Sequence, residues 1–340
     1  MNEIIEKDLR EIATKVENFR DKIAGKTFLV TGGAGFLGSW LCDVLVALDA
    51  NVICVDNLSS GSEKNIEHLM GRKNFQFVNN DILTFSTEVK IDYIVHMASI
   101  ASPPLYQVKQ IETLDANVLG TKKVLDLAKE KKVTALLFTS TSEVYGNPPN
   151  EFIPTPETFY RITNSFGPRS MYDEGKRCAE AYCYAYDQKH KLRIKIARIF
   201  NTYGPRLDSS LATIYSRVIV KFITQALKGE PLTVYGHGKQ TRSFCYVTDM
   251  IVGLVQFLFA SGDETEIINL GSDSEITILE LANKIIDLTG TRSKIEFQPL
   301  PKDDPLRRLP DLTKARKLFG FAFGVNLDEG IKRVISSWAR

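Results

Sequence analysis

The first residues of the chain carry apolar side chains at helical spacing. Between residues 1 and 24 these side chains recur at steps of three and four: Ile5, Leu9, Ile12, Val16, Phe19 and Ile23. This spacing places them on one face of a helix, so we predict an N-terminal amphipathic helix over residues 1–24. Two interpretations remain open, because the helix can dock on its own domain or extend a contact between subunits.

From Lys26 the pattern changes to short apolar runs that alternate with helical segments. The runs are TFLV, NVICVD, FQFVNND, YIVHMAS, ALLFTSTS and RIKIARIF. Continuous apolar runs of this length are typical of buried parallel strands, and their alternation with helices indicates right-handed βαβ units. We predict an α/β fold in which residues 25–200 form a Rossmann-type doubly wound parallel sheet.

Beyond Asn201 the alternation loosens and turns become more frequent. Gly204-Pro205, Gly229-Glu230-Pro231 and Gly236-His237-Gly238 separate the elements there. We expect residues 201–340 to form mainly a smaller α/β part that binds the substrate, with the chain rejoining the first domain at about residues 240–262. A cleft between the two parts is the expected ligand site.

Composition narrows the possible partners. The 340 residues are 44% hydrophobic and 25% charged, with a formal net charge of +2. No apolar run approaches the roughly 18 residues that a membrane span needs, and the charge is too small to indicate nucleic acid. Five cysteines without a CxxC pair indicate neither a disulfide framework nor a metal site. The first residues lack a leader pattern, so a cytoplasmic location is expected.

A glycine-rich turn follows the first predicted strand. Within Thr31 to Gly38, the glycines stand three apart and a helical segment begins at once. Such a turn brings backbone amides and a helix N-terminus to a pyrophosphate. The residues predicted to hold a dinucleotide here are Gly32, Gly35, Phe36, Leu37 and Gly38.

Acidic residues end the next two predicted strands. Asp56 closes NVICVD, where its carboxylate can accept hydrogen bonds from both ribose hydroxyls and would repel a 2'-phosphate. Asn57 after it, and Tyr172 and Lys176 later in the chain, are further candidate contacts of the cofactor. No Arg occurs in Asn57 to Ser60, so NAD is favoured over NADP. Asp81, with Ile82 beside it, is a candidate for the adenine edge, although Asp81 can equally cap the next segment.

Tyr172 and Lys176 lie four residues apart in a segment predicted to be helical. This spacing puts the ammonium near the phenol, where it can lower the phenol pKa from about 10 toward the working pH. Thr141, at the end of the run ALLF, can hydrogen-bond the same reacting hydroxyl. Glu143 lies two residues farther on the same side of an extended chain and can act as an acid, a base or a stabilising charge, or can be a solvated loop carboxylate.

These motifs resemble the extended short-chain dehydrogenase/reductase superfamily, and within it the UDP-glucuronate decarboxylases, also called UDP-xylose synthases. The resemblance runs from about Lys26 to near the C-terminus. It is carried by the glycine turn and by five longer stretches: Ala98 to Tyr106, Thr139 to Gly146, Gly167 to Arg177, Ala197 to Arg206 and Gly229 to Gly236.

The resemblance implies a reaction and further site residues. Tyr172 would deprotonate the sugar O4 while NAD takes hydride from C4, the resulting β-keto acid would lose carbon dioxide, and NADH would return the hydride. Glu143 and Arg242 match positions assigned to decarboxylation and protonation. The positions that match those holding the UDP group are Asn201, Arg217, Tyr235 and Arg308. The resemblance also implies a homodimer formed through two helices of each subunit, one of which contains Tyr172.

Asp115 departs from the decarboxylase pattern, which carries a Lys at this position before Asn117. An acidic residue there does not attract a substrate carboxylate, and the stretch is closer to that of 4-epimerases. A UDP-hexose 4-epimerase therefore remains the main alternative, ahead of a nucleotide-sugar 4,6-dehydratase and a non-catalytic NAD-binding protein.

Overall fold

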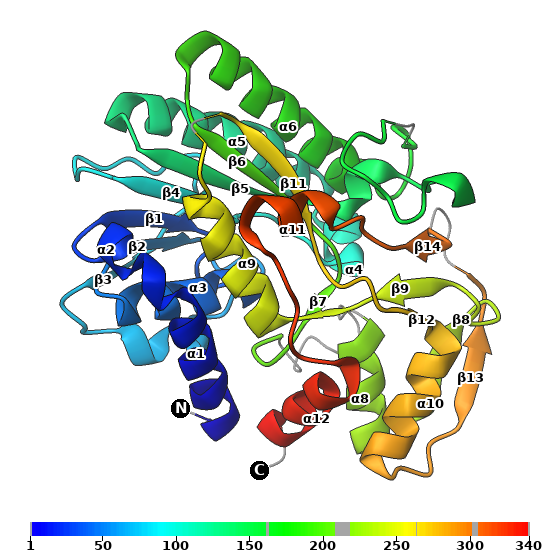
Figure 1. Cartoon of the computed structure of the whole chain (residues 1–340). Coiled ribbons are helices and arrows are strands. Elements are labelled where there is room, and N and C mark those ends of the chain that lie inside the picture. The colour runs from blue at the N-terminus through cyan, green and yellow to red at the C-terminus, as the bar shows by residue number, and fades with distance from the viewer. Residues whose placement is uncertain (1, 161–162, 208–217, 263, 301–304, 339–340) are drawn as a thin grey trace.

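The computed structural model describes residues 2–160, 163–207, 218–262, 264–300 and 305–338. A seven-stranded parallel sheet lies at its centre, in the order β11-β6-β5-β4-β1-β2-β3 (Figure 1). The strands are β1 (Thr27–Thr31), β2 (Asn51–Asp56), β3 (Phe75–Asn79), β4 (Tyr93–His96), β5 (Ala135–Thr141), β6 (Ile194–Ile199) and β11 (Glu266–Leu270). The predicted α/β fold with a parallel sheet is confirmed, and β1 to β6 are its six predicted strands.

Helices cover both faces of this sheet because alternate strand residues point to opposite sides. Phe28 and Val30 of β1 enter one hydrophobic core, whereas Leu29 enters the other. The first core is shared by α1 (Glu3–Val16), α3 (Phe36–Ala47) and α9 (Val247–Phe259). The second core is shared by α5 (Gln110–Lys131) and α6 (Ser170–His190).

The seventh strand comes from the second half of the chain and was not assigned from the sequence. β11 pairs in parallel with β6, with Ile268 opposite Ala197. The chain thus returns to the central sheet after crossing the smaller part, through α9 and then β11.

The smaller part lies beyond the carboxyl ends of the sheet, at the lower right of Figure 1. It combines three short sheets: β7 (Thr202–Tyr203) with β10 (Cys245–Tyr246), β8 (Leu232–Tyr235) with β13 (Ile295–Gln298), and β9 (Thr241–Ser243) between β12 (Glu275–Thr277) and β14 (Arg307–Arg308). The accompanying helices are α8 (Val218–Lys228), α10 (Ile278–Thr289) and α12 (Leu327–Trp338). The remaining short helices are α2 (Arg20–Ile23), α4 (Pro103–Val108), α11 (Thr313–Phe319), η1 (Glu17–Phe19), η2 (Glu63–Asn65), η3 (Glu67–Leu69), η4 (Ser142–Tyr145) and η5 (Asn150–Phe152).

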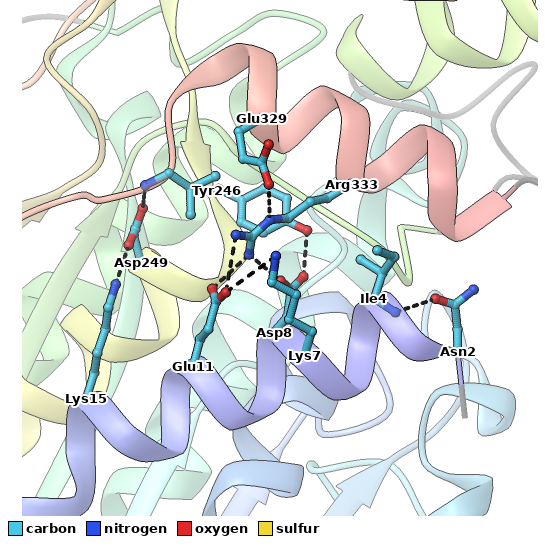
Figure 2. Close-up of polar contacts among 11 residues, drawn as sticks. Asn2, Ile4, Lys7, Asp8, Glu11, Lys15, Tyr246, Asp249, Glu329 and Arg333 are labelled. Carbon is cyan, nitrogen blue, oxygen red and sulfur yellow. Dashed lines mark hydrogen bonds and ion pairs between the residues drawn. The ribbon is translucent and has the colours of Figure 1, made fainter.

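The N-terminal helix docks on its own chain and links the two ends of the sequence. Asp8 of α1 is fully buried, pairs with Arg333 of α12 at 2.6 Å and accepts a hydrogen bond from the Tyr246 hydroxyl at 2.6 Å. Figure 2 shows Arg333 also reaching Glu11 and Glu329. Among the described helices, none combines the length and apolar content needed to cross a membrane.

Candidate functional site

A cavity of about 530 Å³ lies at the carboxyl ends of the central strands. This is the edge at which open parallel sheets bind ligands, because loops and helix N-termini converge there. Every residue predicted to hold the cofactor lines it: Gly32, Gly35, Phe36, Leu37, Gly38, Asp56, Asn57, Asp81, Ile82, Tyr172 and Lys176.

The backbone of the glycine turn packs so closely against neighbouring backbone that side chains would clash there. A Cβ at Gly38 would lie 2.2 Å from the carbonyl oxygen of Gly32, and one at Gly32 would lie 2.7 Å from the backbone nitrogen of Ala98. Gly32 also has a φ of +69°, a conformation that other residues rarely adopt. The turn is therefore built for close backbone approach, and α3 begins from its Gly35 N-cap.

The two strand-end carboxylates are fixed by backbone hydrogen bonds. Asp56 accepts hydrogen bonds from the amides of Ala34 at 3.0 Å and Leu58 at 2.8 Å, and burial raises the pKa of its carboxyl group. Asp81 accepts hydrogen bonds from the Asn57 amide group at 2.8 Å and from a backbone amide in its own turn. Asp81 thus makes a cap-like turn and also faces the cavity.

These residues fit the dinucleotide NAD. The turn leaves room for a pyrophosphate at the N-terminus of α3, and the Asp56 carboxylate stands one strand away, where the adenosine ribose would lie. In the parts of the chain that the structure describes, no group of His, Cys, Asp and Glu side chains is arranged to hold a metal ion.

Tyr172 and Lys176 project from the first turns of α6 into the cavity. The Lys176 ammonium donates a hydrogen bond to the carbonyl oxygen of Thr139 at 2.9 Å. Only 2% of Lys176 is exposed, and this burial lowers the pKa of its ammonium group to about 7. The ring of Tyr172 stacks on that of Tyr106, with centroids 5.3 Å apart and planes 6° from parallel. Stacking on Tyr106 fixes the Tyr172 ring, and the spacing of four residues puts Lys176 on the same side of α6.

Glu143 is held at the end of β5 by two guanidinium groups. Thr141 ends the strand and its hydroxyl accepts a hydrogen bond from the Glu143 amide at 3.3 Å. The Glu143 carboxylate lies 2.5 Å from Arg169 and 2.8 Å from Arg308. Burial works against its charge, but Arg308 and Arg169 lower the pKa of Glu143 to about 2. It is therefore a carboxylate at neutral pH.

Of the other residues predicted to act on the substrate, some lie at the cavity and others do not. Asn201 lines the cavity. Arg308 and Arg242 lie close enough to Glu143, a residue of the cavity wall, to lower the pKa of its carboxyl group. Tyr235 is 38% exposed and packs against Lys221, and it is not part of the cavity wall. Arg217 lies outside the described residues.

Three further side chains at the site carried no sequence assignment. Tyr106 and Arg169 stand inside stretches that resemble the decarboxylases, but their roles become visible only when Tyr106 stacks on Tyr172 and Arg169 pairs with Glu143. Asp173 is four residues beyond Arg169, the spacing of a helical ion pair, and its Oδ2 lies 3.5 Å from the Arg169 Nε. That spacing was the available signal.

Sequence comparison relates the chain to an NAD dependent enzyme family and to UDP-glucuronic acid decarboxylases. Residues 28–271 match the model of the NAD dependent epimerase/dehydratase family. The chain is 45% identical over 315 residues to UDP-glucuronic acid decarboxylase 1 of Danio rerio, covering 93% of this chain and 73% of that protein. It is 44% identical to UDP-glucuronic acid decarboxylase 6 of Arabidopsis thaliana, covering 89% of this chain and 86% of the relative.

A solved structure extends the comparison to the fold. UDP-glucuronic acid 4-epimerase from Bacillus cereus, in complex with UDP-glucuronic acid and NAD, superposes with a TM-score of 0.81 at 28% identity. The match covers 92% of this chain and 98% of the epimerase.

Proposed function

This chain belongs to the NAD dependent epimerase/dehydratase family, and we propose that it decarboxylates UDP-glucuronate to UDP-xylose with NAD regenerated in each turnover. One observation carries the proposal: the redox pair Tyr172 and Lys176 shares its cavity with a carboxylate, Glu143, that two arginines hold ionised. The named decarboxylases at 45% and 44% identity support the same reaction.

The first step concerns the sugar C4. When bound, NAD would accept a hydride from C4 and later return it. Tyr172 takes the proton of the O4 hydroxyl, and Thr141 hydrogen-bonds the same hydroxyl. Lys176, fixed on the Thr139 carbonyl oxygen, stabilises the phenolate by its positive charge.

The second step concerns C5. A ketone at C4 is β to the carboxylate carbon, so the C–C bond breaks with its electrons passing into the carbonyl group and carbon dioxide leaves. We assign Glu143 and Arg242 to this decarboxylation and to the protonation of C5. Asn201, Arg217, Tyr235 and Arg308 are proposed to hold the UDP group, for which guanidinium forks suit the diphosphate.

We also propose a homodimer formed through α5 and α6. Apolar side chains on their outer surface remain exposed, with Leu119 at 48% and Tyr184 at 66%. Ala179 and Cys183, by contrast, belong to the subunit's own core and are fully buried. The cytoplasmic location expected from the sequence stays a prediction.

The test is an incubation of the purified protein with NAD and UDP-glucuronate labelled at the carboxyl carbon. We expect labelled carbon dioxide and UDP-xylose in equal amounts, without net NADH, by mass spectrometry and absorbance. Conversion of UDP-glucuronate to an isomer of the same mass, or interconversion of UDP-glucose and UDP-galactose, would instead support the 4-epimerase that Asp115 on the cavity wall leaves as the alternative.

A Tyr172→Phe variant tests the assignment of the base. It should retain NAD but lose about 10²- to 10⁴-fold in turnover, the usual contribution of a positioned acid or base. Tyr160→Phe, at an exposed tyrosine outside the cavity, is the matched control and should change turnover by less than about twofold. Full activity in Tyr172→Phe would remove Tyr172 from its role.

A further inference from the structure

Asp173 is a buried carboxyl group next to Tyr172 that the steps above leave unused. It is 8% exposed, and within the described part of the chain its Oδ1 has no hydrogen-bond partner. Its Oδ2 lies 3.5 Å from the Nε of Arg169, which is a long contact. A buried carboxylate without partners for both oxygens is costly, so this environment favours the protonated form.

Arg169 lies between Asp173 and Glu143 and favours Glu143. Its terminal nitrogen is 2.5 Å from Glu143, and Arg308 reaches the same carboxylate oxygen at 2.8 Å. Burial, reinforced by the negative charge of Glu143, raises the pKa of Asp173 to about 7. Near neutral pH Asp173 therefore gains and loses a proton, while Glu143 stays ionised.

Other charged and titratable groups border the cluster. They are Tyr106 of α4, Tyr172 of α6, Arg242 of β9 and Arg308 of β14, and Glu112 and Asp115 of α5 line the same cavity. Arg169 contacts the carboxyl groups of both Glu143 and Asp173, and the proton affinity of Glu143 is lowered while that of Asp173 is raised.

The proposed decarboxylation, on which this inference rests, needs a proton at C5. The bond from C5 to the carboxylate carbon breaks, its electron pair passes to the C4 carbonyl oxygen, and carbon dioxide leaves. C5 then binds a proton, so each turnover consumes one. Tyr172 is not the donor, because the proton it took from O4 must return to O4. Ionised Glu143 has no proton to give in the resting site.

We propose that Asp173 is a positioning residue that stores this proton and, through Arg169, controls when Glu143 can deliver a proton to C5. When Asp173 ionises, it draws on the positive charge of Arg169 and adds a negative charge near Glu143. Both changes raise the proton affinity of Glu143, which takes up the proton that Asp173 has released and passes it to C5. Asp173 regains its proton from solvent.

Asp173→Asn tests the proposal because it keeps the size of the side chain and cannot release a proton. Single-turnover absorbance follows NADH formation, and release of labelled carbon dioxide with deuterium uptake at C5 follows the later step. We expect C4 oxidation to change by less than about twofold and kcat for UDP-xylose to fall about tenfold, with KM nearly unchanged. The limb near neutral pH in the C5 protonation rate should disappear.

Asp187→Asn, the same substitution at a partly exposed position near the end of α6 and away from the cavity, is the matched control and should keep the wild-type pH profile. If Asp173→Asn has wild-type kcat and pH profile, or slows both steps equally while losing stability, the proposal is wrong. Infrared spectroscopy of the substrate-free holoenzyme tests the stored proton separately from the proposed decarboxylation. A protonated carboxyl band that titrates near neutral pH and is missing in Asp173→Asn supports the stored proton even if no UDP-xylose forms, and its absence from the wild type overturns it.

Discussion

At the residue scale, Lys176 combines catalytic use with a cost in stability. Its ammonium is buried and its pKa is lowered to about 7, far below the 10.5 of an exposed lysine. Between these values the unfolded chain binds a proton at Lys176 that the folded protein does not. The free energy of unfolding therefore rises with pH across this window, and this stability is lost as the pH falls toward 7.

We predict that Lys176→Met abolishes turnover and stabilises the protein by about 2 kcal/mol at neutral pH. The variant gains stability because it removes the cost of burying a charged amine. It loses part of this gain because the hydrogen bond to Thr139 is also removed. The gain should shrink as the pH approaches about 10. Urea unfolding at matched cofactor content measures it, with the exposed Lys122→Met as control. A variant that is less stable than the wild type at neutral pH would contradict the prediction.

The sequence predicted those site residues whose partners are close in the chain. Gly32, Gly38 and Asp56 belong to one βαβ unit, and Tyr172 and Lys176 share one helix turn, so spacing alone brings them together. The cluster around Glu143 could not be predicted in this way. Arg169 is the N-cap residue of α6 and Arg308 lies in β14, and only the folded chain shows that both contact Glu143. The burial that shifts the pKa of Lys176 likewise comes from tertiary packing.

At the element scale, β1 could be predicted from its local sequence, whereas β11 depends on residues far away in the chain. β1 carries the continuous apolar run FLV, whereas EIINL of β11 begins with Glu266 and contains Asn269. Asn269 is buried because it bonds to Thr155, Asp311 and Tyr145, partners that lie far away in the sequence. These distant partners are not visible in the local pattern around β11.

A buried ion pair holds helix α1 against helix α12 at the other end of the chain. Arg333 is the cation that Asp8 contacts, and Asp8 is fully buried. We predict that Arg333→Leu destabilises the protein by about 3–5 kcal/mol, because it leaves Asp8 buried without a counter-charge. The double variant Asp8→Asn with Arg333→Leu should recover much of this loss, since the isolated charge is gone.

Urea unfolding of the four proteins in this cycle measures the coupling between Asp8 and Arg333. Arg10→Ala is the control, because Arg10 is exposed and lies 3.9 Å from Glu6, and it should cost less than about 0.5 kcal/mol. If Arg333→Leu behaves like Arg10→Ala, the buried pair does not fasten α1.

At the scale of the whole molecule, the outer surface of α5 and α6 connects assembly with the site. A hollow there is lined by Leu114, Val118, Leu119, Arg177 and Cys178, together with Asp115 and Glu174. Asp115 also lines the ligand cavity on its other side. A second copy seated on this surface would therefore cover the outer side of a residue in the wall of the site.

We predict that Leu119→Arg converts the proposed dimer to monomers. In a two-fold interface each substitution occurs twice, so a loss of about 2 kcal/mol per copy raises the dissociation constant about a thousandfold. Sedimentation velocity measures the assembly. Leu227→Arg on α8 is the control, since Leu227 is similarly exposed at 49% but lies elsewhere.

Exposed Cys178 provides a second readout of the same surface. Its reaction with a maleimide should be slow in the wild type at high protein concentration and fast in Leu119→Arg, because a partner subunit would cover the hollow. Turnover per chain should fall with the dimer fraction, since Asp115 loses its outer support. A monomeric Leu119→Arg with wild-type turnover would separate assembly from catalysis, and a wild type that sediments as a monomer would exclude the dimer itself.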